Sequence, residues 1–339
     1  MNILYKASYI IEIFGIFPFI IFLFYSILQL ISHKYLGGFM RNLLSSKEKR
    51  QLELMEFLVT SHEWIHLKSL AEKFLCTERI LKQDLAELRE IFPQVTIHSS
   101  TNGIRAHFSK EASIEDIYRH FLINSQTFSL LEYIFFHEGE NISEVSNAFY
   151  TTPANLYRIV SKIVKESNPH YQFSIQLTPV SITGNEIDIR YFYVQYFSER
   201  YHFLEWPFSD FDEEDINDFA KYFYAPTNYP MGFAIFHMYK WMVMIGIYRV
   251  KNKHFVPIPD NFYNDVFPLY EQLPDLQEKL AYFSNKFQME ITPEILAQIF
   301  ISFIQESIFL SPEEFYHSLN DSDYAQKSYR LLDEMLAKI

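Results

Sequence analysis

The sequence predicts a mainly α-helical protein in which two tandem winged helix-turn-helix domains precede an all-helical domain. Three observations predict this fold class: a helix-turn-helix pattern that occurs twice, a β-hairpin signal after each copy, and nearly continuous helical segments beyond residue 187. The chain has 339 residues, 49% of them apolar, which is enough for two or three domains with their own cores. A single cysteine excludes a disulfide framework and a cysteine-rich zinc site.

Residues 1–40 form a hydrophobic segment ahead of these domains. The uncharged run 13–31 is about long enough to cross a bilayer, and the basic residues after it would keep the rest of the chain in the cytoplasm. A second interpretation is a misassigned start, with translation beginning at Met40, because residues 36–39 can be encoded by a ribosome-binding sequence. A core helix is a third interpretation. We therefore expect a cytoplasmic protein, membrane-anchored only if this segment is translated.

The first winged helix-turn-helix is expected at residues 41–110. An amphipathic helix over 46–60 leads to a short helical stripe, and Thr77 is a favourable N-cap for the helix after the turn. The apolar side of that helix consists of Leu81, Leu85 and Leu88. Two alternating runs follow it with Asn102-Gly103 between them, which predicts a β-hairpin, the wing of the domain.

The pattern returns 75 residues later and predicts a second winged helix-turn-helix at 111–187. Thr152 takes the place of Thr77 as N-cap, and Pro153 stands at the first helical position, where its missing N–H costs nothing. A second hairpin is expected around Thr178-Pro179.

From residue 188 the punctuation by Pro, Asn and Asp predicts a series of helices. They are expected near 188–201, 212–224, 230–250, 261–270, 275–288, 292–309 and 312–337. We divide this part into a regulatory domain at 188–310 and a C-terminal helix at 311–339.

Charge is distributed unevenly along the chain. Residues 41–110 contain 11 basic and 9 acidic residues, whereas 202–339 contain 10 basic and 21 acidic ones. A phosphate-binding surface is therefore expected in the first half. No phosphate-binding loop, dinucleotide fingerprint or nucleophile motif occurs, so we predict neither an enzyme nor a cofactor.

Two winged helices at this spacing, followed by an acidic and aromatic-rich helical region, resemble the Mga/RofA-like family of Gram-positive transcriptional regulators of virulence and stress genes. The stretches that carry the resemblance are 69–88, 141–162 and 173–186, the last continuing into 189–197. The resemblance covers roughly residues 41–310 and is specific only as a combination, because a single helix-turn-helix is common.

The resemblance implies a DNA-binding regulator of virulence or carbohydrate-linked genes. Family members carry two phosphotransferase-regulation domains and then a domain similar to a sugar-transporter enzyme IIB. About 150 residues follow the second wing, so we expect one such domain and, at 311–339, the start of a truncated second one. The implied partners are double-stranded DNA, a second copy in a homodimer, RNA polymerase and a kinase of the sugar phosphotransferase system.

The expected DNA contacts lie at the N-terminal turns of the two recognition helices and in the first wing, where winged helices meet the duplex. These residues are Thr77, Arg79, Lys82, Gln83, Arg105, Asn155, Tyr157, Arg158 and Lys162. Each one alone is more typical of an ordinary solvated surface residue, so the prediction depends on their clustering after two equivalent N-caps. The modest charge predicts weak binding by a monomer.

In the family, histidines of the regulatory domains are phosphorylated, which makes His202, His237 and His254 candidates. His237 lies in an apolar stretch, which favours a buried structural histidine over a phosphorylation site. A different class of function stays open, in which the winged helices only dock proteins or the chain is a truncated paralogue that no longer binds DNA alone.

Overall fold

The computed structural model describes residues 39–307 except 62, 111, 203, 225–232, 259–270 and 272. The segment expected at 1–40, beyond its last two residues, and the helices expected at 261–270 and 311–339 lie outside the described residues. Within the described part, no helix is both long and apolar enough to span a bilayer. The chain divides into two compact units: described residues up to Asp210 together with 233–241, and the remainder.

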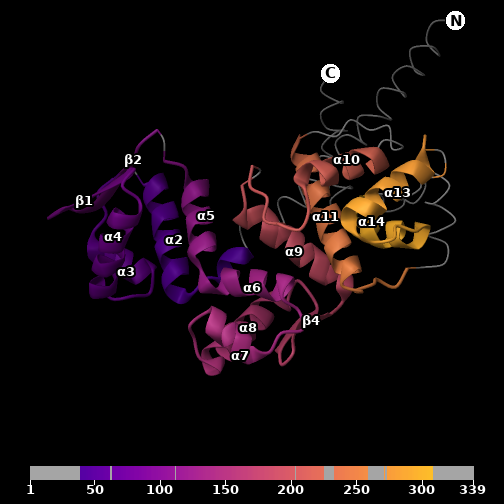
Figure 1. The fold of residues 1–339 in the computed structure, drawn as a ribbon. Coiled ribbons are helices and arrows are strands. Elements are labelled where there is room, and N and C mark those ends of the chain that lie inside the picture. The colour runs from indigo at the N-terminus through magenta and orange to yellow at the C-terminus, as the bar shows by residue number, and fades with distance from the viewer. Residues whose placement is uncertain are drawn as a thin grey trace, which may run out of the picture. The chain divides into compact units, whose positions relative to one another are not determined.

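The predicted fold class is confirmed, and the first winged helix is the group of indigo and violet elements at the left of Figure 1. Its elements are η2 (Met40–Leu43), α2 (Ser46–Thr60), α3 (Leu67–Lys73), α4 (Glu78–Ile91), β1 (Val95–Ser100) and β2 (Gly103–Phe108). The apolar faces of α2 and α4 are fully buried at Leu52, Met55 and Leu81, which form the small core of this domain. The Ser45 side chain and Glu48 cap α2 reciprocally.

The wing is a two-stranded antiparallel hairpin closed by Thr101 and Asn102, with Ser100 paired to Gly103. The predicted hairpin is thus confirmed, but Gly103 opens β2 instead of standing in the turn. Gly103 has a φ of +122°, and a Cβ atom there would lie 2.1 Å from the carbonyl oxygen of Ile65. Ile65 and Ile104 exchange two backbone hydrogen bonds at this point, so glycine lets a third segment pair with the wing.

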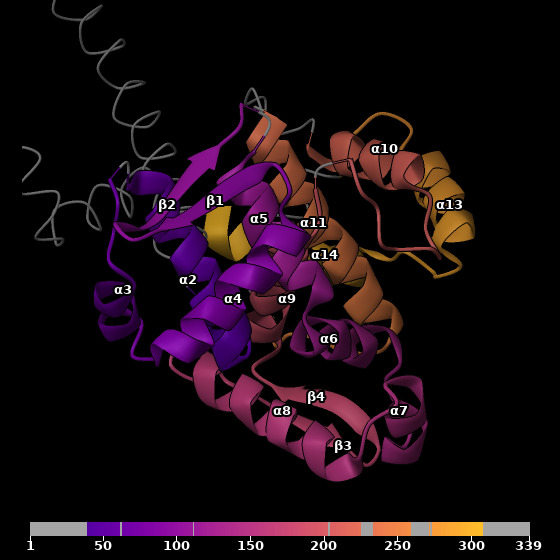
Figure 2. The ribbon, with the colours of Figure 1, turned by 90° about the vertical axis from the view of Figure 1, so that its left-hand side faces the viewer.

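The second winged helix repeats this order (Figure 2). Its elements are α5 (Ile114–Asn124), α6 (Gln126–Phe136), α7 (Ile142–Ala148), α8 (Pro153–Ser167), β3 (Phe173–Leu177) and β4 (Val180–Gly184). Thr178 and Pro179 close its hairpin, as predicted, because Leu177 pairs with Val180. Helix α5 packs against α2 of the first domain.

Helix α9 (Glu186–Arg200) follows the second wing and belongs to the first unit. Its residues are buried on every side from Ile189 to Phe197, which is typical of a core helix. Two of its tyrosines donate to backbone carbonyls of α6: Tyr196 to Phe128 at 2.6 Å and Tyr193 to Leu131 at 3.3 Å. We assigned 188–201 to the regulatory domain, whereas in the structure this helix packs with α5 and β4.

The elements described in the second unit are helices: α10 (Glu213–Tyr224), α13 (Leu276–Phe287), α14 (Pro293–Ser307) and the part of α11 (Phe233–Lys251) from Met242 onward. Its core is aromatic, and the ring of Phe219 stacks on Phe300 with centroids 5.6 Å apart. The helices predicted at 188–201, 212–224, 230–250, 275–288 and 292–309 are confirmed within two or three residues at each end.

Candidate nucleic-acid interface

Helix α4 has the features expected of the first recognition helix. The Thr77 hydroxyl accepts a hydrogen bond from the Ile80 backbone N–H at 3.3 Å, and so caps the helix. The apolar stripe of Leu81, Leu85 and Leu88 is buried. The opposite face, which begins at the capped end, is therefore left open to a partner.

The predicted contact residues of α4 and the wing lie on this open face. Arg79, Lys82 and Gln83 are exposed, and so is Arg105 on β2, where it pairs in register with His98. Among the described residues, Arg79, Lys82 and Arg105 form no ion pair with the protein, so their charges are available to phosphate groups.

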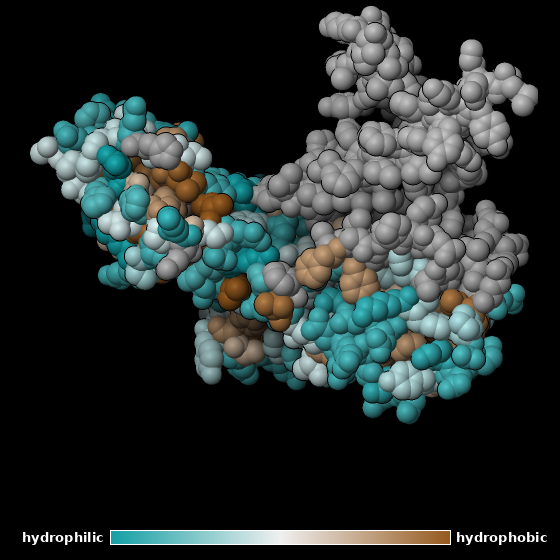
Figure 3. Space-filling model, turned by 90° about the horizontal axis from the view of Figure 1, so that it is seen from above, coloured by the Kyte–Doolittle hydropathy of each residue, from teal (hydrophilic) through white to brown (hydrophobic). Residues whose placement is uncertain are grey.

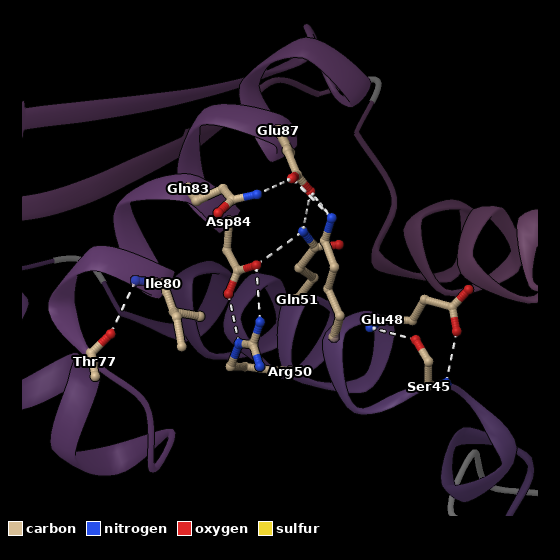
Figure 4. Close-up of polar contacts among 10 residues, drawn as sticks. Ser45, Glu48, Arg50, Gln51, Thr77, Ile80, Gln83, Asp84 and Glu87 are labelled. Carbon is tan, nitrogen blue, oxygen red and sulfur yellow. Dashed lines mark hydrogen bonds and ion pairs between the residues drawn. The ribbon is translucent and has the colours of Figure 1, made fainter.

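A polar network holds the buried side of α4 against α2 (Figure 4). Arg50 on α2 binds Asp84 in a bidentate pair, with Nε 2.6 Å and Nη2 3.1 Å from the carboxylate oxygens. Asp84 is 1% exposed, and the Gln51 amide donates to it at 3.1 Å. A planar pair of this kind fixes direction as well as distance. The network therefore sets the rotation of α4 about its own axis.

The network continues to the exposed face through Glu87. Its carboxylate accepts hydrogen bonds from Lys47 and Gln51, both at 2.8 Å, and these hold the pKa of Glu87 below its ordinary value. Gln83 donates to the same carboxylate at 3.2 Å. Gln83, a predicted DNA contact, is thus connected to α2 through the Glu87 carboxylate. Cys76 sits in the adjacent turn, where burial raises the pKa of its thiol.

Helix α8 offers the same arrangement in the second copy. Thr152 caps it through the Asn155 backbone N–H at 3.3 Å, and Pro153 occupies the first turn. Tyr157 and Arg158 are exposed near this end, and Arg158 donates to the Asn155 side-chain oxygen at 2.9 Å. The buried face of α8 is apolar at the equivalent position, however, because Ile159 occupies the place in the 75-residue repeat that Asp84 occupies in α4.

Lys162 differs from the other predicted contacts. Its ammonium group donates to the backbone carbonyl of Leu44, which directly follows η2, and the side chain is half-buried. Burial lowers the pKa of Lys162. Its position ties the second recognition helix to the first winged domain, so we leave Lys162 out of the interface proposed below.

Two residues near the interface were not among the predicted sites. Arg89 on α4 donates to the Ile97 carbonyl at 2.9 Å and to Ser99, so it fixes the wing to the recognition helix. Ile80 is 40% exposed in the first turn of α4, where an apolar side chain suits a thymine methyl group. The helical pattern alone could have pointed to Ile80, because it lies off the buried leucine stripe.

The three candidate histidines lie apart from this surface in sequence. His237 on α11 accepts a hydrogen bond from the Trp241 indole at 3.2 Å, and the two rings meet edge to face. His202 accepts from the Leu204 backbone N–H at 3.3 Å. The His254 backbone N–H donates to Arg249, at the end of the same helix α11. All three are half-buried.

The first winged domain carries a mostly hydrophilic surface on the face shown in Figure 3, with a small hydrophobic group at its middle. Within the described residues, no cluster of His, Cys, Asp or Glu has the arrangement of a metal site.

Three domain families match the chain in the order of this fold. Residues 45–104 match the M protein trans-acting positive regulator (MGA) HTH domain, and residues 110–197 match the Mga helix-turn-helix domain. Residues 212–339 match the MGA PRD domain. The chain belongs to the Mga family of regulators.

Curated relatives of this Mga-family chain include regulators from two genera. A "Putative trans-acting regulator" from Streptococcus pneumoniae serotype 4 is 39% identical over 301 residues, which cover 88% of this chain and 61% of the relative. The capsule synthesis positive regulators AcpA and AcpB of Bacillus anthracis are 23% and 20% identical, over 60% and 50% of this chain and 43% and 35% of their own lengths. The chain thus spans about three fifths of the first relative and less of the other two.

Proposed function

We propose that this Mga-family protein is a DNA-binding transcriptional regulator that activates virulence or carbohydrate-linked genes. The observation that carries the proposal is the pair of equivalent helices, each capped by a threonine. The first presents the exposed cations Arg79 and Lys82 in its N-terminal turns, and the second presents the exposed cation Arg158. Phosphate contacts supply most of the affinity for a duplex, and the N-terminal turns of such helices enter the major groove.

The proposed contacts are Thr77, Arg79, Lys82, Gln83, Arg105, Asn155, Tyr157 and Arg158. Arg79 and Lys82 suit phosphates or guanine, and Gln83 and Asn155 suit adenine. The surrounding charge is low for such a protein, so both helices, or two copies of the chain, are needed for tight binding.

A gel-shift salt series with the protein and its promoter region tests the proposal. Affinity is expected to fall steeply as salt rises, and Arg79→Ala and Arg158→Ala are each expected to reduce the salt slope by about 1. Lys279→Ala is the matched control, because Lys279 is an exposed cation of α13 in the second unit.

Two outcomes would contradict the proposal. Binding that Arg79→Ala, Lys82→Ala and Arg158→Ala leave unchanged would show that these helices are not the recognition helices. A wild-type protein that binds no duplex but captures other proteins would favour a docking module instead.

The regulatory part of the proposal concerns the remaining chain. We place it in the cytoplasm as a homodimer that contacts RNA polymerase. A phosphotransferase-system kinase would act on His202, His237 or His254, where a phosphate adds about two negative charges. Phosphate on none of the three, in protein incubated with that kinase and examined by mass spectrometry under neutral conditions, would refute this part.

A further inference from the structure

The turn before each recognition helix holds a large apolar side chain in water. Leu75 is 94% exposed and Tyr150 is 98% exposed. They occupy the same place in the 75-residue repeat, two positions before the capping threonine. Single exposed apolar residues are ordinary on proteins, but the same exposure at both equivalent positions is not explained by chance placement alone.

The backbone makes these two residues more unusual. Leu75 has a φ of 49° and Tyr150 a φ of 47°, in the left-handed region that favours glycine. Both turns have the same hydrogen bonds. Leu75 donates to Glu72 and Tyr150 to Asn147, both at 3.3 Å, and each following residue donates to the carbonyl five positions earlier. Glycine would build this turn with less strain, so folding gives no reason for a leucine and a tyrosine here.

The surroundings indicate which partner would cover them. Each side chain stands at the capped end of its recognition helix, four residues before Arg79 in one copy and eight before Arg158 in the other. A recognition helix meets base edges with its first turns, so the residue before the cap faces the rim of the groove. Deoxyribose rings and thymine methyl groups offer apolar surface there, next to the phosphates that the arginines would bind.

We propose that Leu75 and Tyr150 are DNA contacts, one from each winged helix, that pack against the sugar edge of the groove beside the first turn of α4 and of α8. The Tyr150 hydroxyl would in addition reach a phosphate oxygen. This inference rests on the proposed DNA-binding function and adds an apolar contact to each of its two cationic sites.

Leu75→Gly and Tyr150→Gly test the inference, because they separate folding from binding. Each is expected to raise the urea midpoint by relieving backbone strain, and to weaken binding to a fluorescein-labelled mixed-sequence duplex about five- to tenfold. Sugar contacts do not depend on sequence, so this probe is sufficient when affinity is read by fluorescence anisotropy. Leu75→Asn, which tolerates the same backbone but is polar, is expected to lose affinity as well.

Gln288→Gly is the matched control. Gln288 is exposed, has a φ of 50° and ends α13 in the second unit with the same pair of hydrogen bonds. It is expected to raise the urea midpoint and leave DNA affinity unchanged.

Three results would overturn the inference. Glycine variants that are stabilised but bind the duplex as the wild type does would show that the two side chains do not touch DNA. Variants that lose self-association in analytical ultracentrifugation at unchanged DNA affinity would assign them to a contact between copies. If the wild type binds no duplex, the proposed function fails, and this inference fails with it.

Discussion

The contacts of Asp84 determine which face of α4 is buried and which face is exposed. The Asp84 carboxylate is buried and meets Arg50 and Gln51 from α2, whereas its neighbours Lys82 and Gln83 point to solvent. A buried ion pair is weak evidence for stability, since desolvation offsets most of the attraction, but removing one partner leaves a charge without compensation. The pair therefore acts chiefly on the direction of the helix.

We predict that Asp84→Asn destabilises the protein by about 2 kcal/mol, which is less than the roughly 3–5 kcal/mol typical of a fully buried pair because the Arg50 side chain is 20% exposed. The midpoint of urea unfolding measures this change. Glu72→Gln is the control, since it removes a 4.0 Å exposed pair with Lys68 and is expected to cost less than about 0.5 kcal/mol. Equal effects of the two variants would show that the buried pair has no special role.

At the scale of elements, α5 and α9 meet around a carboxyl group. The hydroxyl of Tyr118 on α5 and the amide of Gln195 both donate to Glu199. Burial raises the pKa of Glu199 to about 7, although these hydrogen bonds and the nearby charges of Arg41 and Arg119 oppose the shift. The folded protein therefore binds a proton that the unfolded chain releases near its ordinary pKa of 4.5.

This contact predicts a pH dependence of stability. Between about pH 4.5 and 7 the folded state holds more protons than the unfolded state, so this contribution is present at low pH and is lost as pH rises through 7. The free energy of unfolding, measured with urea from pH 5 to 8, is expected to decline with rising pH less steeply in Glu199→Gln than in the wild type. The difference in slope is up to about 1.4 kcal/mol per pH unit. Glu115→Gln, on an exposed side chain, is expected to keep the wild-type slope, and a parallel slope in Glu199→Gln would refute the assignment.

Elements also show what the sequence could predict. Both capped recognition helices, both hairpins and the five helices described beyond residue 186 follow from N-caps, turn residues and apolar spacing, which are local signals. The role of α9 did not follow, because it buries polar residues such as Arg190 and Gln195 together with its aromatic ones, so its sequence shows no single apolar face that would indicate its neighbours. The contacts of Asp84 with Arg50 and of Lys162 with Leu44 also join segments that are distant in sequence, and the spacing of apolar residues does not predict such contacts.

At the scale of the whole molecule, the two compact units differ in chemistry. The winged-helix unit holds the proposed DNA contacts, and the acidic residues concentrate in the part of the chain from 202 onward. In the second unit, α11 and α14 cross closely at Gly246, where a Cβ atom would lie 2.4 Å from the Ile299 carbonyl oxygen. The close crossing of α11 and α14 therefore depends on the absence of a side chain at residue 246.

We predict that Gly246→Ala loosens the second unit while the winged helices stay folded. Hydrogen exchange is expected to show faster exchange in α13 and α14 and unchanged protection in α4 and α8, because the added methyl group overlaps the Ile299 carbonyl and forces the two helices apart. Ala281→Ser, at an exposed site of α13, serves as the control. Equal loss of protection in both units would show that they unfold as one.

The buried faces of α4 and α8 differ, with an ion pair under α4 and an aliphatic residue under α8, and this difference has a consequence for how the family can diversify. An aliphatic position such as that of Ile159 accepts many replacements of similar volume one at a time. The Arg50–Asp84 pair does not accept single replacements, because a change at either residue alone leaves the other charge without its partner. Both residues must therefore change together. Across homologues, residues 50 and 84 are expected to covary, whereas residue 159 is expected to vary independently among Ile, Leu, Val and Met. Changes in operator preference would therefore arise more readily through α8 than through α4.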